Sequence, residues 1–153
     1  MAWRMTVTGE TSVRVRYAET DQMGVVYYAN FFVWFEVARV EMMRELGFSY
    51  KKMEIEDDSF VVVAKASCTY KRSARFDDVL RIRTCVAQSR RRTSTFSYEV
   101  FNDADGTLIA TGETLHVICD RHGKPKSLPE KYRRYFPLTH AADSVATGTA
   151  HRS

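Results

Sequence analysis

Apolar side chains recur at three- and four-residue intervals in one long stretch, between Ala29 and Leu46. This spacing places them on one face of a helix, and the stripe consists of Phe31, Phe35, Ala38, Met42 and Leu46. Gly47 follows directly and is a typical helix stop. The pattern therefore predicts one long helix from about Ala29 to Leu46, with a face that must be buried.

Most of the remaining chain has the alternating or β-branched pattern of strands. Before the helix, apolar and basic residues alternate over Val13–Tyr17, which we expect to be the end of the first strand, after a lead-in at residues 1–9. After the helix we expect four strands, at residues 60–70, 79–88, 93–102 and 107–120. The Asp-Gly pair at 105–106 is a strong hairpin signal between the last two. Short helical segments are expected at 49–53 and 129–136.

This order of elements predicts an α+β fold in which a five-stranded antiparallel sheet wraps around one long helix. The helix must bury its apolar stripe against a face of the sheet. A chain of 153 residues suits one hydrophobic core, so we expect a single domain over residues 1–137. Residues 138–153 are rich in small and polar side chains and are expected to form a mobile tail.

Composition and charge narrow the class of protein. The net charge of +4 favours acidic partners, but no nucleic-acid-binding module is recognisable, and a phosphorylated cofactor fits a modest excess equally well. No apolar run is long enough to span a membrane, and no export signal is visible. The odd number of cysteines, three, predicts reduced thiols and a cytoplasmic protein.

The candidate chemistry lies just before the long helix. Asp21 falls in the turn at 19–24, next to a helix N-terminus whose unpaired N–H groups can hold an oxyanion. A carboxylate beside such donors is a plausible hydrolytic pair, although an Asp in a turn is more often a backbone cap. The four histidines form no metal-binding spacing, so no metal is expected. The dinucleotide, P-loop and serine-hydrolase motifs are absent.

A resemblance to a known family adds to this interpretation. The segments that carry it are Tyr17, Thr20-Asp21, residues 24–30, Trp34-Phe35-Glu36, Ala38-Arg39, residues 60–62, 77–80 and 125–129. This pattern resembles the hotdog-fold acyl-CoA thioesterases, namely the 4-hydroxybenzoyl-CoA thioesterase family and the related Tol–Pal-associated (YbgC-like) enzymes. Many YbgC-like members have His where this chain has Tyr28, and the 4-hydroxybenzoyl group usually has Pro where it has Ala29. The resemblance therefore leaves the acyl group open.

The resemblance implies a hydrolase that cleaves an acyl-CoA to a carboxylic acid and CoA, with no cofactor, since CoA is part of the substrate. It implies that Asp21 is the catalytic carboxylate and that the backbone N–H of Tyr28 polarises the thioester carbonyl. Expected substrate-binding residues are Gly24, Tyr27, Val61 and Val62. The basic turn Arg90, Arg91, Arg92 and Thr93 is expected to bind CoA phosphates, with Lys71 and Arg72 as weaker candidates. The family also implies a homodimer joined through the strand at 60–70, and such dimers can pair into tetramers.

Three alternatives remain at this stage. Glu36 on the helix is a second candidate for the catalytic carboxylate, although it can also pair with Arg39 at i,i+3. A hotdog dehydratase or hydratase is disfavoured, because residues 22–26 do not continue the motif of those enzymes after Asp21. A non-catalytic module that binds acyl-CoA or an acyl carrier would keep the fold without turnover.

Overall fold

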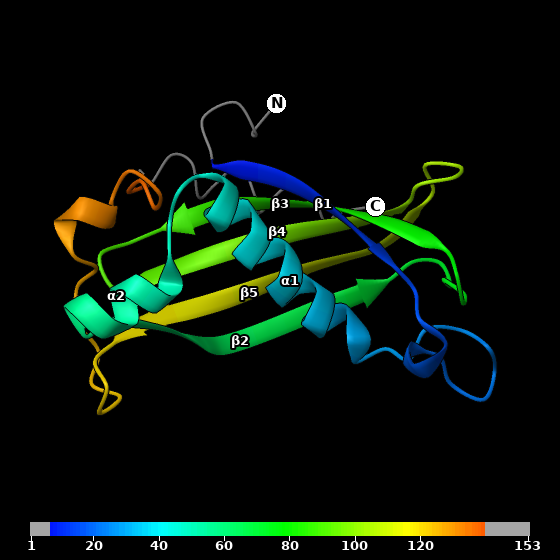
Figure 1. Ribbon diagram of the computed structural model, residues 1–153, viewed down its shortest axis with the longest axis horizontal. Helices are drawn as coiled ribbons and strands as arrows, with labels where there is room; N and C mark the ends of the chain where they lie inside the picture. Colours follow the sequence, from blue (N-terminus) through cyan, green and yellow to red (C-terminus); the bar gives the residue numbers. More distant parts are fainter. Residues whose placement is uncertain (1–6, 140–153) are drawn as a thin grey trace.

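The computed structural model describes residues 7–139, which form one antiparallel sheet crossed by a long helix (Figure 1). The five strands are β1 (Thr8–Arg14), β2 (Phe60–Tyr70), β3 (Val79–Ser89), β4 (Thr93–Asn102) and β5 (Leu108–Cys119). They lie in the order β1-β3-β4-β5-β2, and every neighbouring pair is antiparallel. Strands β1 and β2 are therefore the two edges of the sheet.

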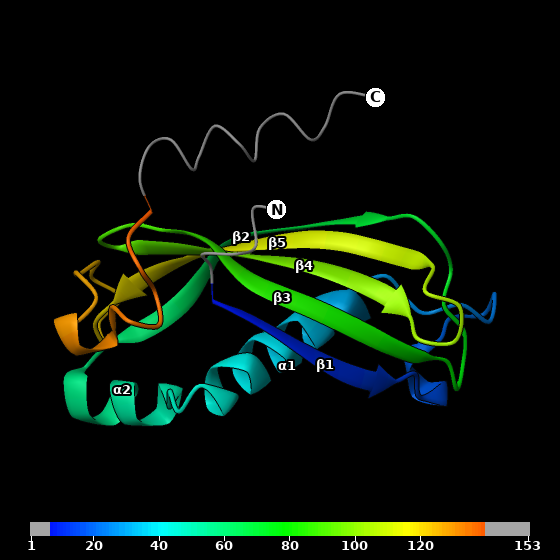
Figure 2. The same cartoon turned by 90° about the horizontal axis from the view of Figure 1, so that it is seen from above.

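Helix α1 (Asn30–Glu45) covers one face of this sheet, and the shorter helix α2 (Tyr50–Asp57) lies on the same side (Figure 2). The core forms where α1 meets the central strands. The ring of Phe35 is fully buried and stacks on Tyr98 of β4, with centroids 4.3 Å apart and planes 11° from parallel. Gly112 of β5 lies against the same ring and leaves the space that Phe35 fills. The helix therefore packs closely because one strand position carries no side chain.

The predicted long helix and the four strands that follow it are confirmed to within a residue or two at each end. The hairpin at 103–106 is also confirmed, since Gly106 donates its N–H to the carbonyl of Asn102. The helical turn predicted at 49–53 is the eight-residue helix α2. The closing helix predicted at 129–136 is present only as the 3-10 helix η3 (Glu130–Tyr132).

The position of the first strand was predicted wrongly. Strand β1 spans Thr8–Arg14, whereas Val13–Tyr17 was expected to form the end of the strand. It stops at Arg14 because that residue pairs with Val79, where its partner β3 begins. Beyond that pair the chain leaves the sheet and turns through the 3-10 helix η2 (Tyr17–Glu19). The true strand was hidden because its first five residues carry no large apolar side chain.

The predicted boundary between domain and tail lies near the end of the described residues. Thr139 still contacts the domain, because its N–H donates to the carbonyl of Ser89 at 3.0 Å. Residues 140–153 of the predicted tail lie outside the described residues.

Candidate active site

Asp21 lies in the loop between η2 and α1, where it organises the backbone around it. Its Oδ1 accepts hydrogen bonds from the N–H groups of Met23 at 2.8 Å and Val25 at 3.4 Å. Gly24 makes the turn with a φ of +78°, a conformation that glycine adopts at little cost. No bond to Oδ2 is formed within residues 7–139, so the carboxylate both caps the loop and keeps an oxygen for a ligand.

Glu19, two residues earlier, fastens this loop to α1. Its carboxylate is almost fully buried and accepts from the indole N–H of Trp34 at 2.9 Å and from the Arg16 N–H at 2.7 Å. Burial alone would raise the pKa of Glu19, but these bonds and the Arg16 charge hold it below its usual value. Its carbonyl oxygen accepts from the Tyr27 N–H and from the side-chain amide of Asn30. One residue thus connects the Asp21 loop to the start of the helix.

Some backbone N–H groups just before α1 already donate a hydrogen bond within the chain, and others do not. Val26 donates to the carbonyl of Ala74 and Tyr27 to that of Glu19. The N–H of Tyr28 has no acceptor within residues 7–139, and no side chain caps the N-terminus of α1. Of the N–H groups near the helix entry that the sequence nominated, Tyr28 is therefore the one left free to polarise a carbonyl.

Asp21 and Tyr28 line the same cavity, which has a volume of about 350 Å³. Phe31 of α1 and Tyr70 of β2 form another part of its wall, and the Tyr70 hydroxyl donates to the Tyr28 carbonyl at 3.0 Å. Lys71 and Arg72 follow Tyr70 and also line the cavity. The site therefore combines a carboxylate, a free N–H, aromatic surface and two cationic side chains.

The other expected substrate residues of this loop lie close to Asp21. The ring of Tyr27 is about half exposed and contacts that of Tyr28, with centroids 4.7 Å apart. Gly24 lies in the same loop and is exposed. Gly24 and Tyr27 are thus near Asp21, and their role in substrate binding stays a prediction.

The remaining expected site residues lie at the opposite end of the sheet. Val61 and Val62 begin β2, whereas Tyr70, which contacts the Asp21 cavity, ends it. Eleven residues of strand correspond to about 33 Å. Thr93 pairs with Val117, and Val117 pairs with Val62, so the turn at 90–93 lies at the far end too. A single copy of the chain does not bring these residues to Asp21.

The basic turn itself has a well-fixed backbone and exposed side chains. Arg133 donates to the carbonyls of Arg90 at 3.0 Å and Arg91 at 2.7 Å. The Arg90 N–H donates to the Thr93 carbonyl and closes the turn. The side chains of Arg90, Arg91 and Arg92 are exposed, and their binding of CoA phosphates stays a prediction.

The sequence interpretation missed two residues that shape the site, Glu19 and Tyr70. Glu19 appeared only as part of a polar turn, and its burial follows from a contact with Trp34 fifteen residues later. Tyr70 appeared only as the end of a strand, and its bond to Tyr28 spans 42 residues. Neither contact leaves a local signal in the sequence.

Glu36, the alternative catalytic carboxylate, is exposed on α1 and lines a different cavity.

The chain is similar to known proteins over most of its length. A family model described as the thioesterase-like superfamily matches residues 15–136. The acyl-CoA thioester hydrolase YbgC of Escherichia coli O6:H1 is 39% identical over 119 residues, which cover 77% of this chain and 87% of YbgC. The YneP protein of Bacillus subtilis strain 168 is 33% identical over 130 residues, which cover 85% of this chain and 91% of YneP.

Solved structures show the same fold. A DHNA-CoA thioesterase from Staphylococcus aureus aligns with a TM-score of 0.75 and 36% identity, covering 92% of this chain and 91% of that one. The 4-hydroxybenzoyl-CoA thioesterase of Pseudomonas sp. strain CBS-3 aligns with a TM-score of 0.76 over 84% of this chain and 98% of its own. At 20% identity the second likeness concerns the fold alone. The predicted hotdog fold is therefore confirmed.

Two further findings concern residues 7–139 only. No group of three or more potential metal ligands is present there. No helix in that range has the length and apolar character required to cross a membrane.

Proposed function

The chain belongs to the thioesterase-like superfamily, and we propose that it hydrolyses acyl-CoA at a site built from Asp21 and the Tyr28 N–H. The activity itself, acyl-CoA thioester hydrolysis, follows from this family and its relatives. The observation that carries the site is the cavity that Asp21 shares with Tyr28, whose N–H has no acceptor in the described part of the chain. The dehydratase alternative has no support from these relatives.

Each group has a defined role in the proposed reaction. The thioester carbonyl oxygen accepts from the Tyr28 N–H, at the positive end of the α1 dipole. The Asp21 carboxylate either attacks the carbonyl carbon, forming a mixed anhydride and releasing CoA thiolate, or removes a proton from a water that attacks instead. In the first route water then hydrolyses the anhydride. Both routes yield the acid and CoA, and both require the ionised carboxylate.

We further propose that the working unit is a homodimer joined edge to edge through β2. Residues Val62 to Ser67 are exposed along this edge, including Val62 and Val63 at 45% and 53%. An open strand with such side chains is prone to pair with another strand. Antiparallel pairing centred on these residues places the Phe60 end of one copy beside the Tyr70 end of the other. The valines at 61–62 of one copy then approach Asp21 of its partner.

The same pairing supports a phosphate-binding role for the basic turn. Arg90, Arg91, Arg92 and Thr93 of one copy lie at the sheet end that would adjoin the Asp21 site of the second copy. Lys71 and Arg72 already line that site. A CoA held between the copies would meet cations from both.

Val33 and Val37 are exposed on the outer face of α1 and offer two dimers a surface on which to form a tetramer.

The test is thiol release from short-chain, long-chain and aromatic acyl-CoAs, with wild type compared to Asp21→Asn. The amide keeps the size of the side chain but cannot act as base or nucleophile, so the rate should fall by at least about 100-fold. Asp105→Asn, in the exposed β4–β5 turn, is the matched control and should keep the wild-type rate.

Other outcomes identify the alternatives. If Asp21→Asn keeps its rate and Glu36→Gln loses it, the carboxylate on α1 is the catalyst and our assignment is wrong. If acyl-CoA binds and no thiol is released by any variant, the chain is a binding module. The acyl-CoA that wild type cleaves fastest defines the acyl class.

A further inference from the structure

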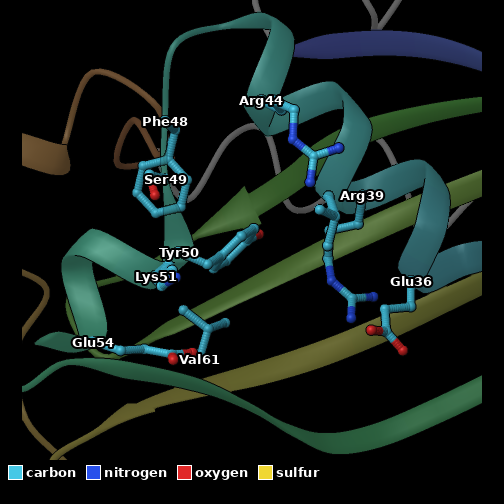
Figure 3. Close-up of a pocket in the computed structure, with 10 residues that line it drawn as sticks. Glu36, Arg39, Arg44, Phe48, Ser49, Tyr50, Lys51, Glu54 and Val61 are labelled. Atoms are coloured by element: carbon cyan, nitrogen blue, oxygen red, sulfur yellow. The ribbon is translucent and has the colours of Figure 1, made fainter.

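A second cavity beside α1 is larger than the one that contains Asp21. It lies between the C-terminal half of α1 and α2 and has a volume of about 440 Å³ (Figure 3). We call it the α1–α2 pocket. Its apolar lining is Val40, Phe48 and Val61, and its polar lining is Glu36, Arg39, Arg44, Ser49, Tyr50, Lys51 and Glu54. The proposed reaction assigns no role to Arg39 and Tyr50.

Arg39 is a partly buried cation without an anionic partner. Its Nη1 donates to the hydroxyl of Tyr98 at 2.9 Å, and its guanidinium carbon lies 5.9 Å from the centre of the Phe96 ring. No carboxylate lies within 4.0 Å of its nitrogens among residues 7–139. A guanidinium withdrawn from water gains most from a carboxylate, which it can bind with two parallel hydrogen bonds.

The Arg39 side chain is also held in place. The Tyr98 hydroxyl that accepts from it is hydrogen-bonded to Thr114 at 2.7 Å, and Thr114 to the buried His116 at 2.8 Å. This chain of bonds runs from the pocket into the sheet. Little ordering of Arg39 would then be required when a ligand binds, which favours affinity.

The hydroxyl of Tyr50 is a second donor that lacks an acceptor. It is shielded from solvent and has no hydrogen-bond partner in the described part of the chain. Burial raises the pKa of Tyr50, and the nearby Arg39 charge only partly opposes this, so the hydroxyl stays protonated. In Figure 3 the Tyr50 and Arg39 side chains extend from α2 and α1 into the same space. A cation without an anionic partner and a hydroxyl without a hydrogen-bond partner thus line one pocket.

We propose that the α1–α2 pocket binds a carboxylate, and that this carboxylate is the far end of the acyl group. The ligand oxygens would accept from Arg39 and Tyr50, while Val40, Phe48 and Val61 enclose its methylene groups. In Figure 3 the Arg39 guanidinium is drawn between Glu36 and Tyr50, while Glu54 lies beside Val61 on the α2 side. The favoured substrates are therefore CoA monothioesters of dicarboxylic acids.

This inference rests on the proposed function, including dimerisation through β2. Val61 lines the pocket and lies at the start of β2. In the paired dimer that end of β2 adjoins Asp21 of the second copy, so an acyl group attacked there extends toward the pocket. The thioester and the distal carboxylate would occupy sites from different copies.

The first experiment compares kcat/KM for adipoyl-CoA with that for hexanoyl-CoA, which has the same number of carbons and no carboxylate. Suberoyl-CoA and octanoyl-CoA form a second pair. Wild type should prefer the carboxylated member of at least one pair by about tenfold or more, as expected for a charge-assisted contact. Arg39→Met should abolish the preference and retain hydrolysis of the uncharged member. Tyr50→Phe removes one hydroxyl and should reduce the preference by a smaller factor.

Arg83→Met is the matched control, because it also replaces an arginine by methionine, on β3 outside the pocket. The Arg83 Nη1 lies 3.8 Å from Oε1 of Glu99. This variant should leave the preference unchanged. If Arg39→Met does not fold, Tyr50→Phe carries the test, since it changes neither charge nor size appreciably. Three results would overturn the proposal that the pocket binds the distal carboxylate of the acyl group. The first is that wild type cleaves both members of each pair equally well, and the second is that Tyr50→Phe and Arg39→Met keep the wild-type preference for the carboxylated member. The third is that wild type prefers 6-hydroxyhexanoyl-CoA to adipoyl-CoA.

The second experiment needs no turnover. Adipate should shift the side-chain N–H resonance of Arg39 in ¹⁵N-labelled protein, and the signal is identified by its loss in Arg39→Met. If no acyl-CoA is cleaved but adipate shifts this resonance, the proposed function fails and the carboxylate site stands, filled by a free acid. If acyl-CoA is cleaved without preference and adipate shifts nothing, the function stands and the carboxylate site is wrong.

Discussion

Glu19 shows how a single side chain can set the geometry of a site without touching substrate. Its carboxylate holds Trp34 of α1, and its carbonyl holds Tyr27 and Asn30. The free N–H of Tyr28 and the Asp21 loop therefore share one anchor. Because a displacement of about 1 Å in reacting groups can cost two decades of rate, such an anchor has kinetic consequences.

We expect Glu19→Gln to lower kcat by about tenfold and to change KM little. The amide keeps the size of the side chain, but its NH₂ group faces a donor, either the Arg16 N–H or the Trp34 indole. Steady-state kinetics on the acyl-CoA that wild type cleaves fastest measures kcat and KM. Trp fluorescence reports on the contact between residue 19 and Trp34. An unchanged kcat in Glu19→Gln would show that Glu19 has no positioning role. Glu130→Gln, on the exposed 3-10 helix η3, serves as the control and should keep the wild-type kcat.

The pKa of Glu19 also predicts how pH acts on this anchor. Its folded-state pKa lies below the ordinary glutamate value, so the stabilisation is complete above that ordinary value. It is lost as pH falls through the lowered folded-state pKa. The unfolding free energy of Glu19→Gln should therefore decline less than that of wild type on acidification, as measured by denaturant titration.

At the scale of elements, the contact between α1 and β5 depends on a missing side chain. Gly112 faces Phe35, and a Cβ there would overlap the Phe35 ring and lie 2.9 Å from the carbonyl oxygen of Ser67 on β2. Close packing leaves no room for this atom without movement of the helix or the sheet.

Gly112→Ala should therefore destabilise the fold by about 1–3 kcal/mol, the range typical of overpacked cores. Chemical denaturation measures this, and Phe35→Leu in the same chain provides a double-mutant test. The smaller side chain should recover part of the loss caused by Gly112→Ala. Simple additivity of the two substitutions would contradict a direct clash between these residues.

At the scale of the whole molecule, the proposed dimer would unite candidate residues that a single copy of the chain keeps apart. The Asp21 cavity lies at one end of β2, and both Val61 and the basic turn at 90–93 lie at the other. Assembly and activity are therefore expected to depend on the same strand edge.

Ala66→Glu tests this dependence. Ala66 is exposed near the centre of the β2 edge, and an antiparallel two-fold pairing would bring two added carboxylates close together. Light scattering should show the mass falling from twice that of the chain toward once, with loss of thioesterase activity. Ala104→Glu, in the exposed β4–β5 turn, should change neither. A monomeric wild type with full activity would refute the shared site.

The sequence alone determined the elements and the main candidate for catalysis. Periodicity located α1 and four strands, because the side-chain spacing of helices and strands is a local property. The resemblance nominated Asp21 and the Tyr28 N–H, which share a cavity in the structure, whereas their catalytic roles remain predictions. The first strand was misplaced because its limit is set by β3, a partner more than sixty residues away.

Tertiary structure decided what lies next to what. Only the folded chain shows that Glu19 contacts Trp34, that Val26 and Tyr27 have already used their N–H groups, and that Arg39 and Tyr50 share a pocket. It also separates residues that the sequence had grouped into one site, by the length of β2. These facts depend on contacts between distant segments, and such contacts are fixed by burial and hydrogen bonding across the whole fold rather than by any local pattern.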